Sequence, residues 1–313
     1  MAFTLTEAKR SKAKLRLAID GPSGSGKTYS ALLIAYGLTN DWSKIAVIDT
    51  ERESANLYYD LCGNNKKYRV GQINAPYTPQ KYLEALKVCE ESGIEVAIID
   101  SLTHAWTAEG GLLDIHASAV KKQKTANSYT AWGDVTPLHR KLVDAILTSP
   151  IHIISTVRSD TEYSQEKDAN GKTVVKKVGM KPQFRKGLDY EMTIVFSLEQ
   201  NHMATITKSR INTFPVNDTV LPTFETGQKL LKWLNEGDDA PTCSECGKVI
   251  KAYGNMTAEQ VALYGQRKYG RSVCIECGSK LKEIDYGEKT EDEKPKDVLL
   301  NAKGENEDES NQN

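Results

Sequence analysis

The chain has 313 residues and a net charge of −1, with 39% hydrophobic and 27% charged residues, as is ordinary for a globular protein. Its longest apolar stretches, such as residues 31–38, are too short to cross a bilayer, and no apolar run follows a basic N-terminal segment. These features exclude a membrane-spanning helix and a secretory signal, so we expect a cytoplasmic protein.

Short apolar runs alternate with helical patterns through the first half of the chain. We expect strands at residues 15–20, 44–51, 68–74, 96–101 and 151–158, and helices at residues 29–38, 78–92 and 135–148. This alternation predicts an α/β fold with a mostly parallel sheet. Three later segments alternate more strictly, at residues 172–180, 190–199 and 202–210, and predict antiparallel strands added at one edge. A helix at residues 226–237 would close this first domain.

The eight residues GPSGSGKT, at positions 21–28, match the phosphate-binding pattern G-x-x-x-x-G-K-[ST]. Glycines let such a loop wrap a phosphate with backbone N–H groups, and the following helix adds its positive N-terminus. Lys27 would reach the β- and γ-phosphates of a nucleotide, and Thr28 would hold Mg²⁺. A chance glycine-rich turn is the alternative. The expected nucleotide-binding residues are Gly21, Pro22, Ser23, Gly24, Ser25, Gly26, Lys27, Thr28, Tyr29 and Asp100.

Acidic side chains end two of the expected strands. Asp100 ends the apolar run VAIID and would orient the Mg²⁺ ion, although an aspartate there can also serve only as a cap. Asp49 and Glu51 end the strand after the phosphate-loop helix, at the edge where open α/β sheets bind ligands. A carboxylate there would polarise an attacking water as general base. A capped strand end with a solvated glutamate is the alternative.

Together these motifs resemble the RecA-core branch of P-loop ATPases. The resemblance rests on GPSGSGKT, Asp49-Thr50-Glu51, IIDS at residues 98–101 and the polar strand end at Ser155 and Thr156. It implies Glu51 as catalytic base and Thr156 as sensor of the γ-phosphate. More narrowly, the stretches IDTERESA, HAW and GMKPQFRKGLDYEMTIVF resemble phage-encoded AAA-type proteins of the Sak type over residues 12–236. That resemblance implies single-strand DNA annealing or recombination in an infected bacterial host.

Lys208 and Arg210 lie two residues apart, on one face of the last expected strand. In hexameric RecA-fold relatives a K-x-R pair reaches the neighbouring subunit's γ-phosphate, and a guanidinium suits this role because it binds two phosphate oxygens. The resemblance therefore implies a catalytic pair acting in trans and a homo-oligomer. The alternative is a solvated strand edge protected by charge.

The same resemblance implies two DNA-facing loops, and both are rich in cations here. The later one contains no acidic residue and carries Lys172, Lys176, Lys177, Lys181, Arg185 and Lys186, with Phe184 among them. The earlier one carries Lys121, Lys122, Lys124, Tyr129 and Trp132. Cations with interleaved aromatic rings suit single-stranded DNA, whereas an exposed hairpin charged for solubility is the alternative. A single-strand-binding or other recombination protein would be a further partner.

Two C-x-x-C-G motifs follow the core, at residues 243–247 and 274–278. Four thiolates suit a tetrahedral, closed and therefore structural Zn²⁺ site, and the glycines would permit tight turns beside the sulfur atoms. The expected ligands are Cys243, Cys246, Cys274 and Cys277, and a capping box at Thr257 and Gln260 predicts a helix between the pairs. We expect a zinc-ribbon-like module at residues 238–282, after a core at residues 1–237.

The last segment, residues 283–313, contains eleven acidic residues and four lysines, which leaves a net charge of +6 on the residues before it. We expect this acidic tail to be disordered. For the whole chain the leading hypothesis is an ATPase that uses ATP and Mg²⁺ on single-stranded DNA. The alternatives are a nucleotide-gated binding protein with slow hydrolysis and a small-molecule kinase.

Overall fold

The structure is a computed structural model that describes residues 10, 12–122, 127–167, 173–185, 187–237, 239, 241–254 and 256–287. For residues 161–167, 173–180 and 282–287 it describes the backbone alone. The chain forms two compact units, Met1–Gly237 and Asp238–Asn313. Within the described residues, no helix has the length and apolarity needed to span a membrane.

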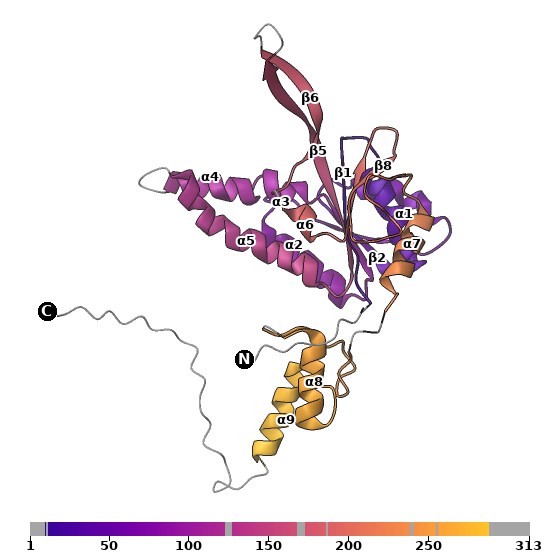
Figure 1. The fold of residues 1–313 in the computed structure, drawn as a ribbon, viewed down its shortest axis with the longest axis vertical. Helices are drawn as coiled ribbons and strands as arrows, with labels where there is room; N and C mark the ends of the chain where they lie inside the picture. The colour runs from indigo at the N-terminus through magenta and orange to yellow at the C-terminus, as the bar shows by residue number, and fades with distance from the viewer. Residues whose placement is uncertain are drawn as a thin grey trace, which may run out of the picture. The chain divides into compact units, whose positions relative to one another are not determined.

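A single sheet organises the first unit, in the order β3-β2-β4-β5-β1-β7-β8-β9 (Figure 1). Its strands are β1 (Arg16–Gly21), β2 (Ile45–Asp49), β3 (Arg69–Gln72), β4 (Val96–Asp100), β5 (His152–Lys167), β7 (Ile194–Leu198), β8 (Ala204–Ser209) and β9 (Thr219–Val220). The strands from β3 to β7 in this order are parallel, and β8 and β9 are antiparallel. The α/β fold with antiparallel edge strands is therefore confirmed. Two details were wrong. The strand predicted at residues 190–199 pairs in parallel with β1, and the strand predicted at residues 172–180 is antiparallel but pairs with the central strand β5 and not at the edge.

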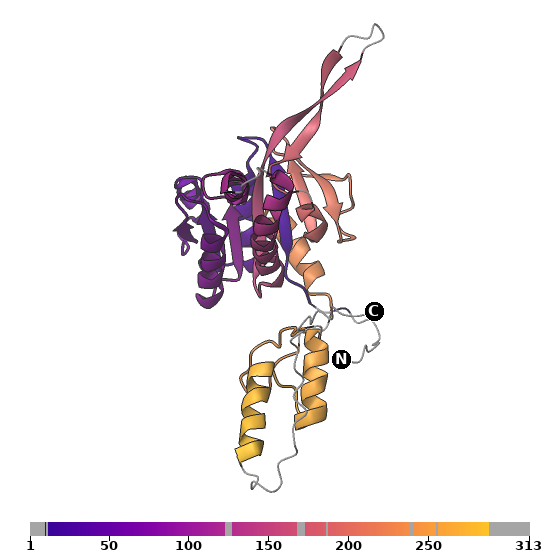
Figure 2. The ribbon, with the colours of Figure 1, turned by 90° about the vertical axis from the view of Figure 1, so that its left-hand side faces the viewer.

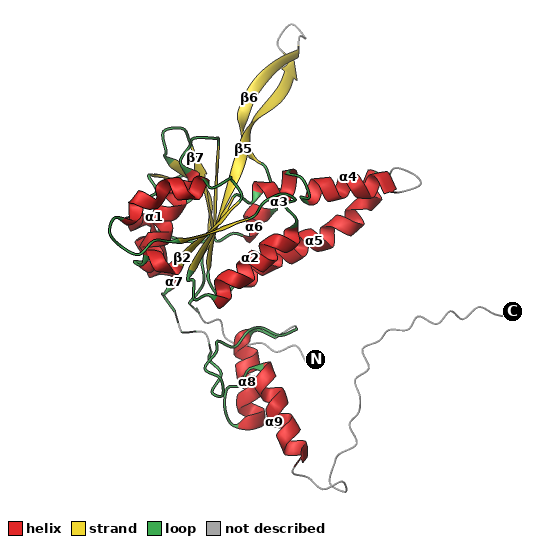
Figure 3. Ribbon diagram, turned by 180° about the vertical axis from the view of Figure 1, so that it is seen from behind, coloured by secondary structure: helices red, strands yellow, loops and turns green. Residues whose placement is uncertain are grey.

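Helices cover both faces of the sheet (Figure 3). One face packs against α1 (Lys27–Thr39) and α7 (Phe224–Leu234), and the other against α2 (Pro79–Glu91) and α5 (Ser128–Thr148). Successive residues of a strand point to opposite faces, so Leu17 and Ile19 join the first layer while Ala18 joins the second. Burial on both sides explains why β1, β2 and β4 are continuous apolar runs with few polar positions.

Beyond the sheet, β5 continues into a two-stranded hairpin with β6 (Thr173–Pro182), which extends away from the helical layers (Figure 2). Its pairing runs from Ser159 opposite Pro182 to Lys167 opposite Thr173. This unit also contains α3 (Thr103–Thr107), α4 (Leu112–Lys122), α6 (Leu188–Glu191) and two 3₁₀ helices, at Trp42–Lys44 and Ser54–Cys62. The hairpin therefore starts at the point where the central strand β5 leaves the parallel sheet.

The second unit contains α8 (Ala258–Tyr269) and α9 (Ile275–Gly287) around a small apolar core. Thr257 and Gln260 form the reciprocal capping box at the start of α8, as the sequence predicts. The second cysteine pair lies at the start of α9, so this part of the module is helical instead of ribbon-like. Helix α9 continues past residue 282 as far as Gly287.

Candidate functional site

The loop of residues 21–28 leads from strand β1 directly into helix α1, as a phosphate-binding loop requires. Gly24 and Gly26 adopt positive φ angles of 79° and 87°, which other residues rarely do. Lys27 Nζ donates to the carbonyl oxygens of Gly21 and Pro22, at 3.0 and 2.7 Å. Burial lowers the pKa of Lys27, and the nearby Asp100 and Glu51 carboxylates oppose that shift. The loop lines a cavity of about 1020 Å³.

A chain of three side chains connects helix α1 to strands β4 and β5. Thr28 Oγ1 donates to Asp100 Oδ2 at 2.7 Å, and Thr156 Oγ1 donates to Asp100 Oδ1 at 2.5 Å. Asp100 is 2% exposed, and burial raises its pKa while the two hydroxyls act in the opposite direction. Thr28 and Asp100 thus present oxygen atoms side by side at the cavity, as a Mg²⁺ site needs. Thr156 is fully buried behind Asp100 and does not line the cavity, so its contact is with Asp100.

The two acids after strand β2 have different environments. Asp49 is 1% exposed and accepts hydrogen bonds from the backbone N–H groups of Glu51 and Ala55, at 2.6 and 3.2 Å. Glu51 instead lines the cavity. Burial alone would raise its pKa, but the hydrogen bond and positive charge of Arg158 outweigh that effect, so the pKa lies below its ordinary value. Of the two, only Glu51 is placed to act on a bound nucleotide, and Asp49 holds the turn that presents it.

Several cavity residues had not been singled out in the sequence. Arg158 follows Thr156 by two residues, at the point where β5 leaves the parallel sheet, and pairs with Gly21 in the parallel register. Tyr58 forms an edge-to-face aromatic pair with Tyr29, which the sequence did predict at the site, and their ring centroids are 6.0 Å apart. His202 Nδ1 lies 3.0 Å from the Ser25 carbonyl oxygen. Arg158 was the most detectable of these, because it is the first charged side chain after a buried apolar run.

The residues around the cavity fit a nucleotide with Mg²⁺. Lys27 and Arg158 supply positive charge, Thr28 and Asp100 supply the oxygen ligands of a hard cation, and Tyr29 offers a half-exposed ring. When bound, the metal would neutralise phosphate charge and orient the phosphate oxygens. Glu51 lies at the same cavity and could accept a proton from a water molecule there.

Lys208 and Arg210 lie at the amino-terminal end of the parallel strands, opposite the end that carries the phosphate loop. Ser209 pairs with Ile194, which adjoins the start of β1 at Leu17, whereas Gly21 and the phosphate loop are at the carboxyl end of β1. Lys208 Nζ donates to the Tyr190 carbonyl oxygen at 2.8 Å and also to that of Met192, and Arg210 Nη2 donates to the Tyr190 carbonyl at 2.8 Å. Within one chain, the pair therefore caps helix α6 and does not reach the cavity.

The basic segment predicted to contact DNA is only partly described. Lys172 and Lys186 lie outside the described residues, as does Lys124, and Lys176 and Lys177 are described as backbone positions of β6. Lys181 is exposed at the base of the hairpin. The Arg185 guanidinium lies 5.2 Å from the Trp132 ring centroid, and Trp132 stacks on His116 with centroids 4.2 Å apart. Tyr129, at the start of α5, is 87% exposed.

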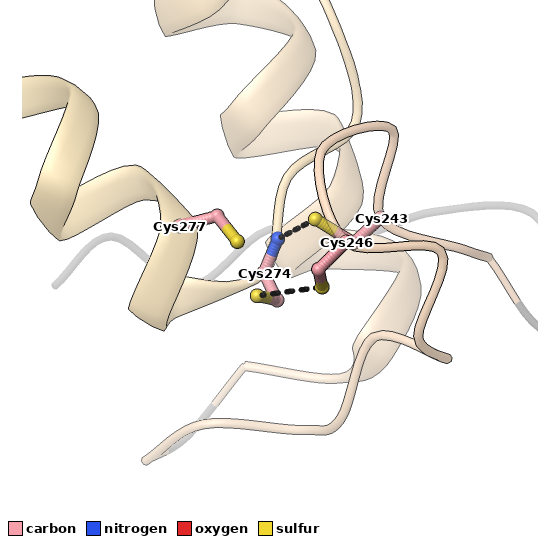
Figure 4. A group of neighbouring side chains, drawn as sticks. All are labelled: Cys243, Cys246, Cys274 and Cys277. Carbon is pink, nitrogen blue, oxygen red and sulfur yellow. Dashed lines mark hydrogen bonds between the residues drawn. The ribbon is translucent and has the colours of Figure 1, made fainter.

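The four cysteines of the second unit converge (Figure 4), and their sulfur atoms lie within 4.8 Å of one another. Cys246 Sγ and Cys274 Sγ are 3.9 Å apart, and the backbone N–H of Cys274 donates to Cys243 Sγ at 3.2 Å. Burial opposes ionisation of Cys243, but the backbone N–H groups aimed at its sulfur hold its pKa below the ordinary value. Four converging thiols fit a structural Zn²⁺ ion.

The glycines of the two motifs differ in conformation. Gly247 adopts the predicted tight turn, with a φ angle of 67°. Gly278 was predicted to do the same, but it lies within helix α9, where its carbonyl oxygen accepts a hydrogen bond from Tyr269 Oη at 2.9 Å. A Cβ atom at Gly278 would lie 3.4 Å from the Tyr269 ring, an ordinary van der Waals contact, so no turn or close approach requires a glycine at this position.

Comparison with known proteins agrees with this geometry. Residues 13–227 match the model of the AAA domain family AAA_24. That span contains the phosphate loop, Glu51, Asp100 and Arg158, and it ends within helix α7. A search of curated proteins finds no significant match. The chain belongs to the AAA domain family, whose P-loop NTPase domain implies nucleotide binding.

Proposed function

We propose that this protein hydrolyses ATP in a manner controlled by single-stranded DNA, in recombination or replication of the phage type. The observation that carries the DNA part of the proposal is that the nucleotide cavity and the basic hairpin share strand β5. Arg158, Ser159 and Asp160 line the cavity, and the same strand continues directly into the hairpin. At the returning end of the hairpin, Gln183 also lines the cavity and donates to the Asp160 carboxylate.

The proposed reaction uses residues that meet at the cavity. Lys27 and the loop N–H groups bind the phosphates, while Thr28 and Asp100 hold the metal. Glu51 accepts a proton from the water molecule that attacks the γ-phosphorus, and ADP departs with the electrons of the broken P–O bond. Thr156 holds Asp100 in place through its hydrogen bond.

In this proposal the hairpin and the earlier basic loop form the DNA surface, where cations neutralise phosphates and aromatic side chains stack on bases. Tyr129 is the most exposed described aromatic residue in the earlier basic loop. The acidic tail at residues 283–313, which lies mostly outside the described residues, would compete with DNA for these cations.

The test is the ATP hydrolysis rate of the full chain with and without single-stranded DNA. Stimulation supports the proposal, and a slow rate that DNA leaves unchanged favours a nucleotide-gated binding protein. The ion pair between Glu51 and Arg158 gives that second candidate a specific basis, because it engages the carboxylate and lowers the pKa of the proposed base. Transfer of phosphate to a small acceptor would instead indicate a kinase.

DNA contact by the hairpin has a separate test in the salt dependence of binding. Lys176→Gln combined with Lys177→Gln should reduce the slope of log affinity against log salt concentration by about 1.4, since each phosphate contact on a single strand contributes about 0.7. Lys229→Gln combined with Lys232→Gln, on helix α7, is the matched control and should leave the slope unchanged. Equal slopes for all three proteins would remove the hairpin from the DNA site.

A further inference from the structure

Arg158 holds both carboxylate oxygens of Glu51. Its Nε donates to Oε1 at 2.9 Å, and its Nη2 donates to Oε2. The Glu51 side chain is 24% exposed and that of Arg158 is 45% exposed, so both ends of the pair face the cavity. This fork occupies two of the four lone-pair sites of the carboxylate, and the positive charge of Arg158 lowers the pKa of Glu51, so the paired carboxylate is a weaker proton acceptor than a free one.

The backbone fixes Arg158 beside the phosphate loop. Its Cα is the register partner of Gly21, and its N–H donates to Thr103 Oγ1 at 2.8 Å. Its positive charge is close enough to Lys27 to contribute to the lowered pKa of that residue, after burial. The Arg158 side chain, Glu51 and the phosphate loop therefore line the same cavity.

The two possible partners of Arg158 carry different charges. Glu51 offers one negative charge, whereas a terminal phosphate carries more and presents three oxygen atoms. The planar fork of a guanidinium binds either group through two parallel hydrogen bonds. A nucleotide with a terminal γ-phosphate at this position would therefore compete directly with Glu51, and a nucleoside diphosphate would not.

We infer that Arg158 senses the γ-phosphate and thereby controls Glu51. Without a triphosphate, Arg158 keeps the Glu51 carboxylate paired; when the γ-phosphate enters, Arg158 exchanges the carboxylate for phosphate oxygens and Glu51 becomes free to accept a proton from water. This inference rests on the proposed function of Glu51 as general base. It explains how the site avoids presenting an active base before its substrate is complete.

A permanent ion pair that merely orients Glu51 is the competing explanation, and equilibrium binding separates the two. Exchange means that Glu51 and the γ-phosphate compete for one guanidinium. Removing the charge of Glu51 should then strengthen binding of a triphosphate while leaving a diphosphate unaffected. A permanent pair predicts no such selective change, because both nucleotides would meet the same site.

The experiment is a double-mutant cycle on the full chain, titrated with a fluorescent ADP and with a fluorescent non-hydrolysable ATP analogue. Glu51→Gln should raise the preference for the triphosphate about fivefold to thirtyfold, the range expected when one or two kcal/mol of pairing is released. Arg158→Gln should abolish most of the preference, and Glu51→Gln should add nothing in that background. Arg69→Gln, on the edge strand β3 and outside the cavity, is the matched control.

The outcomes of this experiment distinguish failure of the Arg158 exchange from failure of the proposed ATPase function. If the unaltered protein binds neither nucleotide, the proposed ATPase function fails. If it binds both but Glu51→Gln leaves the triphosphate preference unchanged, the exchange is overturned and the ion pair is permanent. A preference that survives in Arg158→Gln would likewise overturn the role of Arg158 as the sensor.

Discussion

Thr28 Oγ1 and Asp100 Oδ2 lie 2.7 Å apart, in a hydrogen bond that joins the first turn of helix α1 to the carboxyl end of strand β4. These residues are 72 positions apart in the chain, and strand β5 separates β4 from the strand that carries the phosphate loop. The hydrogen bond thus sets two oxygen ligands together before any metal arrives. Such preorganisation lowers the cost of binding Mg²⁺ with a nucleotide.

Thr28→Ala should therefore weaken nucleotide binding chiefly when Mg²⁺ is present. We expect a loss of at least about tenfold in affinity with the metal, because one oxygen ligand disappears and Asp100 loses its partner, and a smaller change without it. Titration of a fluorescent ADP with and without Mg²⁺ measures both affinities. Thr28→Ser keeps the hydroxyl and is the control. Equal Mg²⁺ dependence in Thr28→Ala and the unaltered protein would argue against this ligand assignment.

Strong local patterns made the phosphate loop and the central strands predictable. The loop has a fixed spacing, and residues buried on both faces of a sheet must be apolar wherever the strand lies. The start of helix α5 was less predictable: it begins at Ser128 instead of residue 135, because Asn127 Oδ1 accepts hydrogen bonds from the N–H groups of Tyr129 and Thr130. The polar first turns of that helix hide its beginning from a search for apolar periodicity.

Contacts between distant segments were beyond the reach of sequence patterns. Thr156 was predicted to sense phosphate, but the pairing of β4 with β5 directs its hydroxyl to Asp100. Arg158, two positions later, is the side chain that lines the cavity. Strand β7 alternates like an antiparallel edge strand, yet it lies parallel to β1, since direction depends on the connection and not on the pattern of the strand itself.

Arg210→Ala offers a test of action between subunits. If Arg210 reaches the γ-phosphate of a neighbouring copy, the variant should bind ATP normally but lose about a thousandfold or more in turnover, as for other arginine fingers. If it only caps helix α6 through the Tyr190 carbonyl oxygen, turnover should persist and stability should fall by about 0.5–1.5 kcal/mol. The measurements are steady-state hydrolysis, nucleotide titration and urea unfolding.

Mixing two inactive variants makes that test sharper. Arg210→Ala lacks the proposed finger and Glu51→Gln lacks the proposed base, so a mixed oligomer would contain some sites with both residues intact. Hydrolysis should reappear when the two proteins are combined at equal concentration. Lys229→Ala, an exposed position on helix α7, replaces Arg210→Ala in the control series. If mixing restores no activity although oligomers form, action in trans is excluded.

His152 should make the stability of the first unit depend on pH. Its Nδ1 accepts a hydrogen bond from the backbone N–H of Leu15 at 3.0 Å, and burial, followed by the charges of Lys14 and Arg16, lowers its pKa to about 3. The unfolded chain takes up this proton near pH 6.5 and the folded chain does not, so the free energy of unfolding must fall as pH falls from 6.5 toward 3. The decrease from pH 7 to pH 5 attributable to this residue is about 2 kcal/mol.

His152→Asn measures that contribution, because its amide oxygen can still accept a hydrogen bond but does not titrate. Urea unfolding at pH 5, 6 and 7 should show a shallower pH dependence for the variant, with the difference between the two proteins changing by about 2 kcal/mol across the range. The variant should be less stable at pH 7, where neutral histidine fits its buried place. Parallel pH profiles would mean that His152 is not kept neutral by the fold.

Removing the metal should unfold the second unit and leave the first intact. The described apolar core around the cysteines has only five buried residues, Cys243, Ile250, Val261, Ala262 and Val273, which is little to stabilise helices of 12 and 13 residues. We expect one Zn²⁺ per chain by elemental analysis. Cys274→Ser or a strong chelator should then remove the metal and the helical signal of α8 and α9 in circular dichroism, while nucleotide affinity is retained.

Cys89→Ala, which alters a buried cysteine in the core of the first unit, is the control and should keep its zinc. A Cys274→Ser protein with unchanged helical content would show that this unit folds by its apolar core alone.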